Sequence, residues 1–253
     1  MKKSLNIVLI CVCVGVLCFS GYKLISYFSE NSRAEQAYED IRSPELVDST
    51  SISNSTYEDL LPYYQKLHEQ NSHFIGWLSI PGTNVNYPVM QTPQEPNYYL
   101  YRDFHQKDAP SGSLFASEHS SVTRPSDVVI INGHRMKTGA MFGNFGKFLE
   151  QDYLTDHSRV VFDTLVGRNE YKIWCVFTEA VDTGSAGEFQ YYNYSDFSNE
   201  TDFNGFVSQA KAHSKIENSD VSPKYGDHFL LLSTCEYTHD NGRLIVVCIR
   251  TTE

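Results

Sequence analysis

The sequence is short of basic residues, and it has few cysteines outside its N-terminal segment. Lysine and arginine number 20 against 31 aspartates and glutamates, which gives a formal net charge of -11. Proteins that bind the phosphate backbone of nucleic acids need a basic surface, so we expect no nucleic-acid partner. Three of the six cysteines (Cys11, Cys13 and Cys18) lie in an N-terminal apolar run. No cysteine pair has the spacing of metal ligands, and the remaining three are too few for a disulfide framework. We therefore expect no structural zinc, no disulfide scaffold and no cofactor.

The composition is that of a globular protein with an ample core. Apolar residues make up 41% of the 253 residues and aromatic residues 13%. These fractions exclude a disordered chain. The length allows one substantial domain with additional segments, and no internal repeat is apparent.

The N-terminal segment has the length and composition of a membrane span. Residues 4–22 form a run of nineteen without a charge, preceded by Lys2 and Lys3. At 1.5 Å per residue this run is long enough to cross a bilayer, and the two lysines favour a cytoplasmic N-terminus with the rest of the chain outside the cell. The competing interpretation is a cleaved signal peptide, with a weak small-x-small site at residues 32–34.

The rest of the chain divides into a polar stretch and a folded domain. We expect residues 1–28 to form the cytoplasmic tip and membrane anchor, residues 29–55 a polar extracellular stalk with a helical piece over 33–42, and residues 56–253 the folded domain. Thr56 is a candidate N-cap for a helix that Pro62 bends or restarts.

Short strand patterns dominate the folded domain. Eight segments rich in apolar residues are separated by Gly, Pro, Asn and Asp clusters: 73–80, 84–90, 113–117, 127–132, 158–165, 169–180, 227–235 and 242–250. Eight strands in about 180 residues predict a mainly β fold, either a closed barrel or a sandwich. Helical interruptions are expected near 140–149 and 202–216.

The last two strand segments form a predicted β-hairpin that carries a thiol and a guanidinium. If the turn is centred on His239, Cys235 lies opposite Arg243, and directly opposed residues share one face of a sheet. A nearby cation lowers the pKa of a thiol and favours the nucleophilic thiolate. The alternatives are an inert buried cysteine and a surface ion pair between Arg243 and Asp240 or Glu236.

A cysteine nucleophile needs an acid and base, and His134 is the strongest candidate among nine histidines. It follows an apolar strand that ends in Asn132-Gly133, on a loop carried by a rigid element. The alternative is an exposed loop histidine. His239 is the second candidate, but it lies at the hairpin turn. Cys248 alternates out of phase with Arg243 and Cys175 has a core-strand context, so both are expected to be structural.

These motifs resemble those of the sortases, and in detail those of class B. The resemblance rests on Ser233-Thr234-Cys235 closing a strand, Arg243 eight residues later and Asn132-Gly133-His134 after an earlier strand. Further similar stretches are Phe74-Ile-Gly-Trp-Leu, Tyr87-Pro-Val-Met, Asn97-Tyr-Tyr-Leu100, Gly139-Ala-Met-Phe-Gly and Leu232-Ser-Thr-Cys-Glu236. The chain departs from class B in having Glu95-Pro96-Asn97 where an Asp-Asn pair is common.

The resemblance implies an eight-stranded β-barrel enzyme on the outer face of a Gram-positive membrane. Such an enzyme cleaves a C-terminal sorting signal after threonine, holds the acyl group as a thioester and transfers it to an amine of a peptidoglycan precursor or a pilin lysine. By motif, Cys235 is the nucleophile, His134 the general acid and base, and Arg243 the oxyanion or substrate clamp. The positions implied to line the substrate groove are Leu100, Ser233, Thr234 and Glu236.

Two other functions remain possible from the residues alone. One is a hydrolytic cysteine peptidase, although these usually place the cysteine on a helix with distant His and Asn partners. The other is a membrane-tethered binding module without chemistry, for which Cys235→Ala is expected to be harmless.

Overall fold

The computed structural model describes residues 2–42, 55–181, 187–235 and 241–251, without the side chains of residues 2–9, 27, 31, 34 and 235. Its helical elements are α1 (Lys2–Asp40), α2 (Tyr57–Gln70), α3 (Gln151–Asp156) and α4 (Glu200–His213), with short 3₁₀ turns η3 (Tyr98–Tyr101), η4 (Phe145–Leu149) and η5 (Tyr191–Asn193). Its strands are β1 (Phe74–Ser79), β2 (Asn86–Met90), β3 (Leu114–Ala116), β4 (Val128–Asn132), β5 (Arg159–Thr164), β6 (Arg168–Ala180), β7 (Ser214–Glu217), β8 (Phe229–Cys235) and β9 (Gly242–Arg250).

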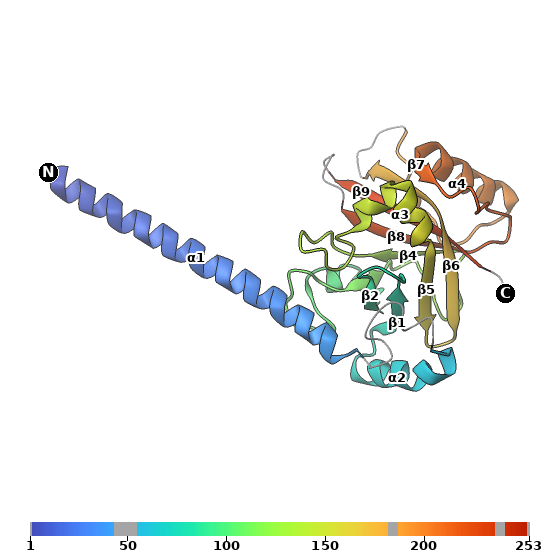
Figure 1. Cartoon of the computed structure of the whole chain (residues 1–253), viewed down its shortest axis with the longest axis horizontal. Coiled ribbons are helices and arrows are strands. Elements are labelled where there is room, and N and C mark those ends of the chain that lie inside the picture. Colours follow the sequence, from blue (N-terminus) through green and yellow to red (C-terminus); the bar gives the residue numbers. More distant parts are fainter. Residues whose placement is uncertain (1, 43–54, 182–186, 236–240, 252–253) are drawn as a thin grey trace.

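Eight of these strands close into a barrel. Their order is β5-β1-β2-β3-β4-β8-β9-β6, and β5 also pairs with β6, which completes the ring (Figure 1). These eight are the eight predicted from the sequence. Within the described residues β7 is a ninth strand, attached to the outer edge of β6 over the segment where a helix was expected to continue to Ile216. The prediction of a mainly β, eight-stranded barrel is therefore confirmed, with β7 as an addition.

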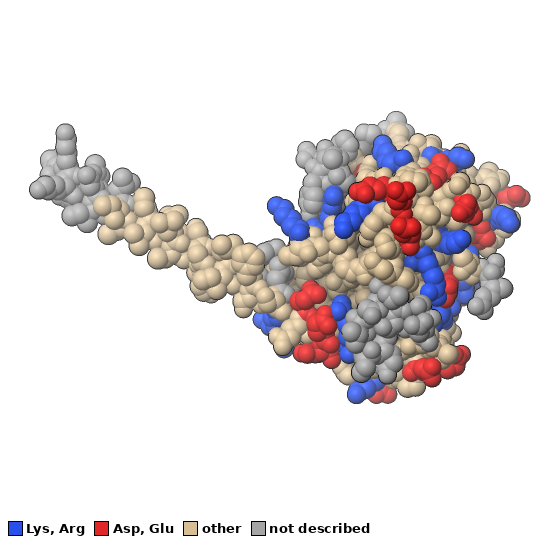
Figure 2. Space-filling view, in the orientation of Figure 1, with Lys and Arg blue, Asp and Glu red and all other residues tan. Residues whose placement is uncertain are grey.

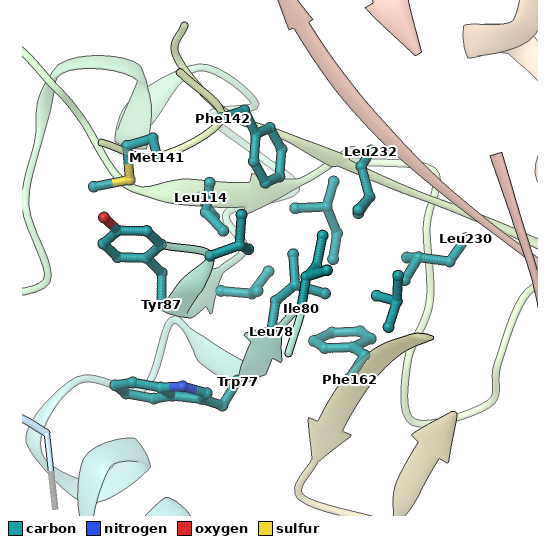
Figure 3. Close-up of a cluster of buried hydrophobic side chains, with 14 of the residues drawn as sticks. Trp77, Leu78, Ile80, Tyr87, Leu114, Met141, Phe142, Phe162, Leu230 and Leu232 are labelled. Atoms are coloured by element: carbon teal, nitrogen blue, oxygen red, sulfur yellow. The ribbon is translucent and has the colours of Figure 1, made fainter. Parts of the chain in front are cut away.

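The barrel wall separates two hydrophobic clusters, which explains why its strands are apolar on both faces. Inside the barrel, Leu230 and Leu232 of β8 join Leu78, Leu114 and Phe162 (Figure 3). The alternate residues of β8, Phe229 and Leu231, belong to a second cluster on the outer face beneath α4. Because successive side chains of a strand point to opposite faces, a strand buried on both faces needs a continuous apolar run.

The two helices before the barrel have local capping and packing signals. The Asp59 amide donates to the Thr56 hydroxyl, which confirms Thr56 as the N-cap of α2. Pro62 lies inside α2, and the helix runs past it to Gln70. The apolar face of α2, with Leu60, Tyr64 and Leu67 buried, packs at the barrel's end (Figure 1).

Helix α1 is longer than expected, and its last turns pack on the barrel. Tyr38 is 1% exposed, and its hydroxyl donates to the Gly112 carbonyl at 2.6 Å. The Arg33 guanidinium donates to the Asp108 carbonyl at 2.6 Å. The first part of the expected stalk is thus helix in contact with the folded domain, while residues 43–54 lie outside the described residues. Farther out, α1 carries mostly uncharged side chains (Figure 2), and residues 10–40 include a stretch long and apolar enough to cross a membrane.

Candidate active site

The barrel topology brings the ends of two distant strand segments together. Strands β4 and β8 run parallel and in register from Val128 opposite Phe229 to Asn132 opposite Ser233. His134 and Cys235 each follow the last of these pairs by two residues. Because both strands run in the same direction, His134 and Cys235 lie at the same edge of the sheet. A hydrogen bond from the Gly133 amide to the Ser233 carbonyl, 3.1 Å long, continues the pairing up to this edge.

The hairpin of β8 and β9 has the register expected from its sequence. Cys235 pairs with Arg243 across the antiparallel ladder, as Ser233 does with Ile245. The turn itself, with Glu236 and His239, lies outside the described residues, as does the Cys235 side chain. The register therefore places the backbone of the predicted nucleophile directly opposite the predicted arginine.

His134 is held by a backbone carbonyl from a different loop. Its Nε2 lies 2.7 Å from the carbonyl oxygen of Leu100, in η3, and its ring is 5.2 Å from the ring of Tyr101. Since a carbonyl oxygen only accepts, Nε2 must carry the proton of this bond. In the neutral ring, Nδ1 is then the nitrogen with the lone pair available to take a proton.

The surroundings of His134 favour its neutral form. Burial lowers the pKa of His134 below its ordinary value, and the positive charge of Arg243 lowers this pKa further, while the hydrogen bond to Leu100 acts in the opposite direction. A neutral imidazole can act as a general base, and after protonation it can act as a general acid.

Five of the predicted site residues line one cavity of about 320 Å³: Leu100, His134, Ser233, Thr234 and Arg243. Apolar and polar residues complete its wall, including Pro96, Asn97, Phe115, Glu118 and Asn132. Larger cavities lie elsewhere, beside α1 and near the start of α2, and none of their lining residues is among the predicted site residues. We assign the site to the smaller cavity because it brings together the candidate base, the arginine and the end of β8.

Two neighbours of this cavity were not predicted from the sequence. The Tyr191 hydroxyl lies 2.9 Å from the Ser233 hydroxyl, and both side chains are buried. The Leu100 carbonyl, rather than a side chain, orients His134. The only available signal was the aromatic richness of residues 189–197, which does not say where their hydroxyls point. Thr234 is 2% exposed, and its hydroxyl has no hydrogen-bond partner among the described residues.

The surroundings of the two other barrel cysteines make their thiols unreactive. Cys248 is fully buried in the inner cluster, opposite Leu230, and Cys175 is fully buried in the outer one. Burial raises the pKa of both thiols well above the ordinary value. Neither is therefore a thiolate at neutral pH.

The sortase domain model matches residues 78–251, which is more than half of the chain. The chain belongs to the sortase family. It is similar to sortase B of Listeria monocytogenes, 29% identical over 249 residues that cover 97% of this chain and 95% of that one. Sortase B of Staphylococcus aureus is 27% identical over 249 residues, covering 98% and 96% of the two chains.

Solved sortase B structures share the fold. The substrate complex of Staphylococcus aureus sortase B superimposes with a TM-score of 0.75 at 25% identity, over 88% of this chain and 99% of that one. Sortase B of Bacillus anthracis superimposes with a TM-score of 0.66 at 29% identity, over 76% and 85%. The resemblance to class B sortases is confirmed, and with it the coarse function, a cysteine transpeptidase.

Proposed function

We propose that this sortase cleaves a C-terminal sorting signal after threonine at Cys235, and that His134 and Arg243 complete its catalytic machinery. The observation that supports this most is the shared register of β4, β8 and β9. His134 and Arg243, about 100 residues apart in the sequence, line one cavity, and Cys235 is the residue paired with Arg243.

The proposed reaction is an acyl transfer in two steps. His134 takes the thiol proton on Nδ1, and the Cys235 thiolate attacks the threonine carbonyl of the signal peptide. Arg243 stabilises the negative charge that forms on the carbonyl oxygen. His134 then gives its proton to the leaving amine, and a thioester remains on Cys235. An incoming amine, deprotonated by His134, attacks the thioester and restores the thiol.

The groove for the signal peptide is proposed to include Leu100, Ser233, Thr234 and Glu236. The first three line the cavity, whose wall combines polar and apolar residues that suit an extended peptide. The amine acceptor is a peptidoglycan precursor or a pilin lysine. The enzyme is proposed to be anchored by α1, with Lys2 and Lys3 in the cytoplasm and the barrel outside the cell.

The test is cleavage of a library of sorting-signal peptides by the purified full chain in detergent, with cell-wall and pilin-lysine amines present. Cys235→Ala and His134→Ala are each expected to abolish both thioester formation and amide product. Thioester on the wild-type protein is detected by mass spectrometry. Turnover that persists in either variant would remove that residue from the reaction.

The conservative variant Arg243→Lys tests the third role. It keeps the positive charge but loses the planar fork of the guanidinium, so we expect a large loss of kcat. Near-normal kcat in this variant would exclude Arg243 as the oxyanion clamp. A hydrolytic peptidase differs in its product, because adding amine would then leave the free acid as the only product.

A further inference from the structure

Arg243 has a carboxylate on the side away from Cys235. Strand β9 pairs with β8 on one side and with β6 on the other, and the residue opposite Arg243 on β6 is Glu179. Directly opposed residues of antiparallel strands share a face, so Cys235, Arg243 and Glu179 form one row across three strands. The row lies on the outer face, because Phe177, two residues before Glu179, belongs to the outer cluster.

The junction of α4 and β7 adds a fourth member to this row. Ser214, the first residue of β7, pairs with Phe177, and β7 is antiparallel to β6. The residue before it, His213, is the last residue of α4 and contacts Glu179. Its Nδ1 is 2.5 Å from Glu179 Oε2, and its ring is 5.8 Å from the ring of Phe189.

The Glu179 carboxylate is nearly enclosed. The exposed fractions of the two side chains are 10% for Glu179 and 24% for His213. Apart from the contact with His213, Glu179 Oε2 accepts no hydrogen bond from the described residues. An uncompensated charge in this environment is unfavourable, so the contact with His213 stabilises the carboxylate where it lies.

Two side chains lie next to Glu179 among the described residues, His213 by direct contact and Arg243 by strand pairing. His213 holds the carboxylate on the α4 side. Arg243 lies on the other side, and its side chain lines the active-site cavity and acts electrostatically on His134. A Glu179 carboxylate without His213 would attract the guanidinium toward β6 and offset its charge at the site.

We propose that Glu179 and His213 form a positioning pair that keeps Arg243 directed into the active-site cavity. His213 engages the carboxylate, so that the charge of Arg243 acts on the thiolate and on the oxyanion of the transition state. Neither member of the pair contacts the substrate. This inference rests on the proposed function of Arg243 in acyl transfer.

The pair predicts opposite effects for its two members. His213→Gln removes the imidazole that contacts Glu179, and kcat is expected to fall about tenfold with KM little changed, because an interaction of the transition state is weakened. Glu179→Gln removes the opposing charge, and kcat is expected to rise by about twofold. The double variant is expected to recover most of the kcat that His213→Gln loses. His213→Lys, which places an ammonium group at the end of α4, is expected to retain at least about half of the wild-type kcat.

A second readout separates positioning from folding. The pH dependence of iodoacetamide alkylation reports the apparent pKa of the reactive thiol, which His213→Gln is expected to raise and the double variant to restore. Lys211→Gln is the matched control, because Lys211 is on the same helix and its carboxylate partner, Glu217 at 3.9 Å, lies outside the row. This control is expected to behave as the wild type in both assays.

The outcomes separate this inference from the proposed function. If the double variant is as slow as His213→Gln, the pair is structural and the inference is wrong. The same holds if Glu179→Gln alone reduces kcat, a comparison that remains decisive where His213→Gln does not fold. If instead Cys235→Ala still cleaves peptide, the proposed function fails, whatever the pair does to the rate.

Discussion

Gly133 offers a sharp test of how the site is built, because it joins the end of β4 to His134. A Cβ at this position would lie 2.5 Å from Leu114 Cδ2 and 2.8 Å from Phe142 Cδ2. Both of those side chains are fully buried, and the Phe142 ring stacks on Phe145 with centroids 4.1 Å apart. Figure 3 shows Leu114 and Phe142 side by side in the packed core. Neither can move away without disturbing its other neighbours, so Gly133→Ala forces an extra carbon into a filled space.

This close packing determines how much Gly133→Ala destabilises the protein. Inserting a methyl group into a packed core destabilises a protein by about 1–3 kcal/mol. For a domain of about 200 residues, this corresponds to a fall in Tm of roughly 2–4 °C per kcal/mol. His134 is the next residue, and the Phe142 amide donates to its carbonyl at 3.0 Å. A displacement of His134 from the Leu100 carbonyl by ~1 Å is enough to reduce kcat by about a hundredfold.

Gly167→Ala is the control, because a Cβ there meets no atom within 4 Å. Both substitutions reduce the backbone freedom of the unfolded chain, which by itself stabilises the folded protein by about 0.4–1 kcal/mol. Differential scanning calorimetry and peptide cleavage should therefore show a lower Tm and kcat/KM for Gly133→Ala, with Gly167→Ala at or above the wild-type Tm. Equal behaviour of the two variants would refute the close-packing explanation.

Two further predictions concern buried charge. Burial lowers the pKa of His134 in the folded protein, so His134 takes up a proton in the unfolded chain first as the pH falls. The stability that neutral His134 contributes is therefore complete above about pH 6.5 and declines below it. Urea unfolding at pH 7.5 and pH 5 should show a smaller difference for His134→Gln than for the wild type. Asp163 is 1% exposed, accepts two hydrogen bonds of 2.8 Å from the Arg168 guanidinium and accepts a third from the Tyr64 hydroxyl. Asp163→Asn should therefore lower the free energy of unfolding in urea by ~3–5 kcal/mol. Glu170→Gln, in a pair with 38% of each side chain exposed, should cost less than ~1 kcal/mol, and a similar loss for both would contradict this account.

The parts of the fold that follow from local pattern could be predicted from the sequence. The hairpin register of Cys235 and Arg243 depends only on strand alternation and the length of one turn. The eight barrel strands are continuous apolar runs because both faces of the wall are buried. By contrast, β7 has only the four residues Ser214–Glu217, and its strand conformation comes from pairing with β6, which no local pattern records.

The contacts that orient the site depend on pairing between distant segments. The parallel register of β4 and β8 joins residues about 100 positions apart, and a sequence pattern contains no information on it. The Leu100 carbonyl is a backbone group, so the identity of its residue does not reveal that it holds His134. Glu179 and His213 were not singled out for the same reason: each becomes relevant only when β6, β7 and β9 are side by side.

The position of Arg243 on a central strand of this wall explains how one guanidinium serves a site made from separate segments. Strand β9 lies between β8, which ends in the proposed nucleophile Cys235, and β6, which carries Glu179. A charge on β9 is therefore one strand away from Cys235 on one side and from Glu179 on the other. At such distances, partly buried charges interact with energies that change rates by an order of magnitude. We therefore expect the direction of the Arg243 side chain to depend on both flanking strands, which the barrel holds in register.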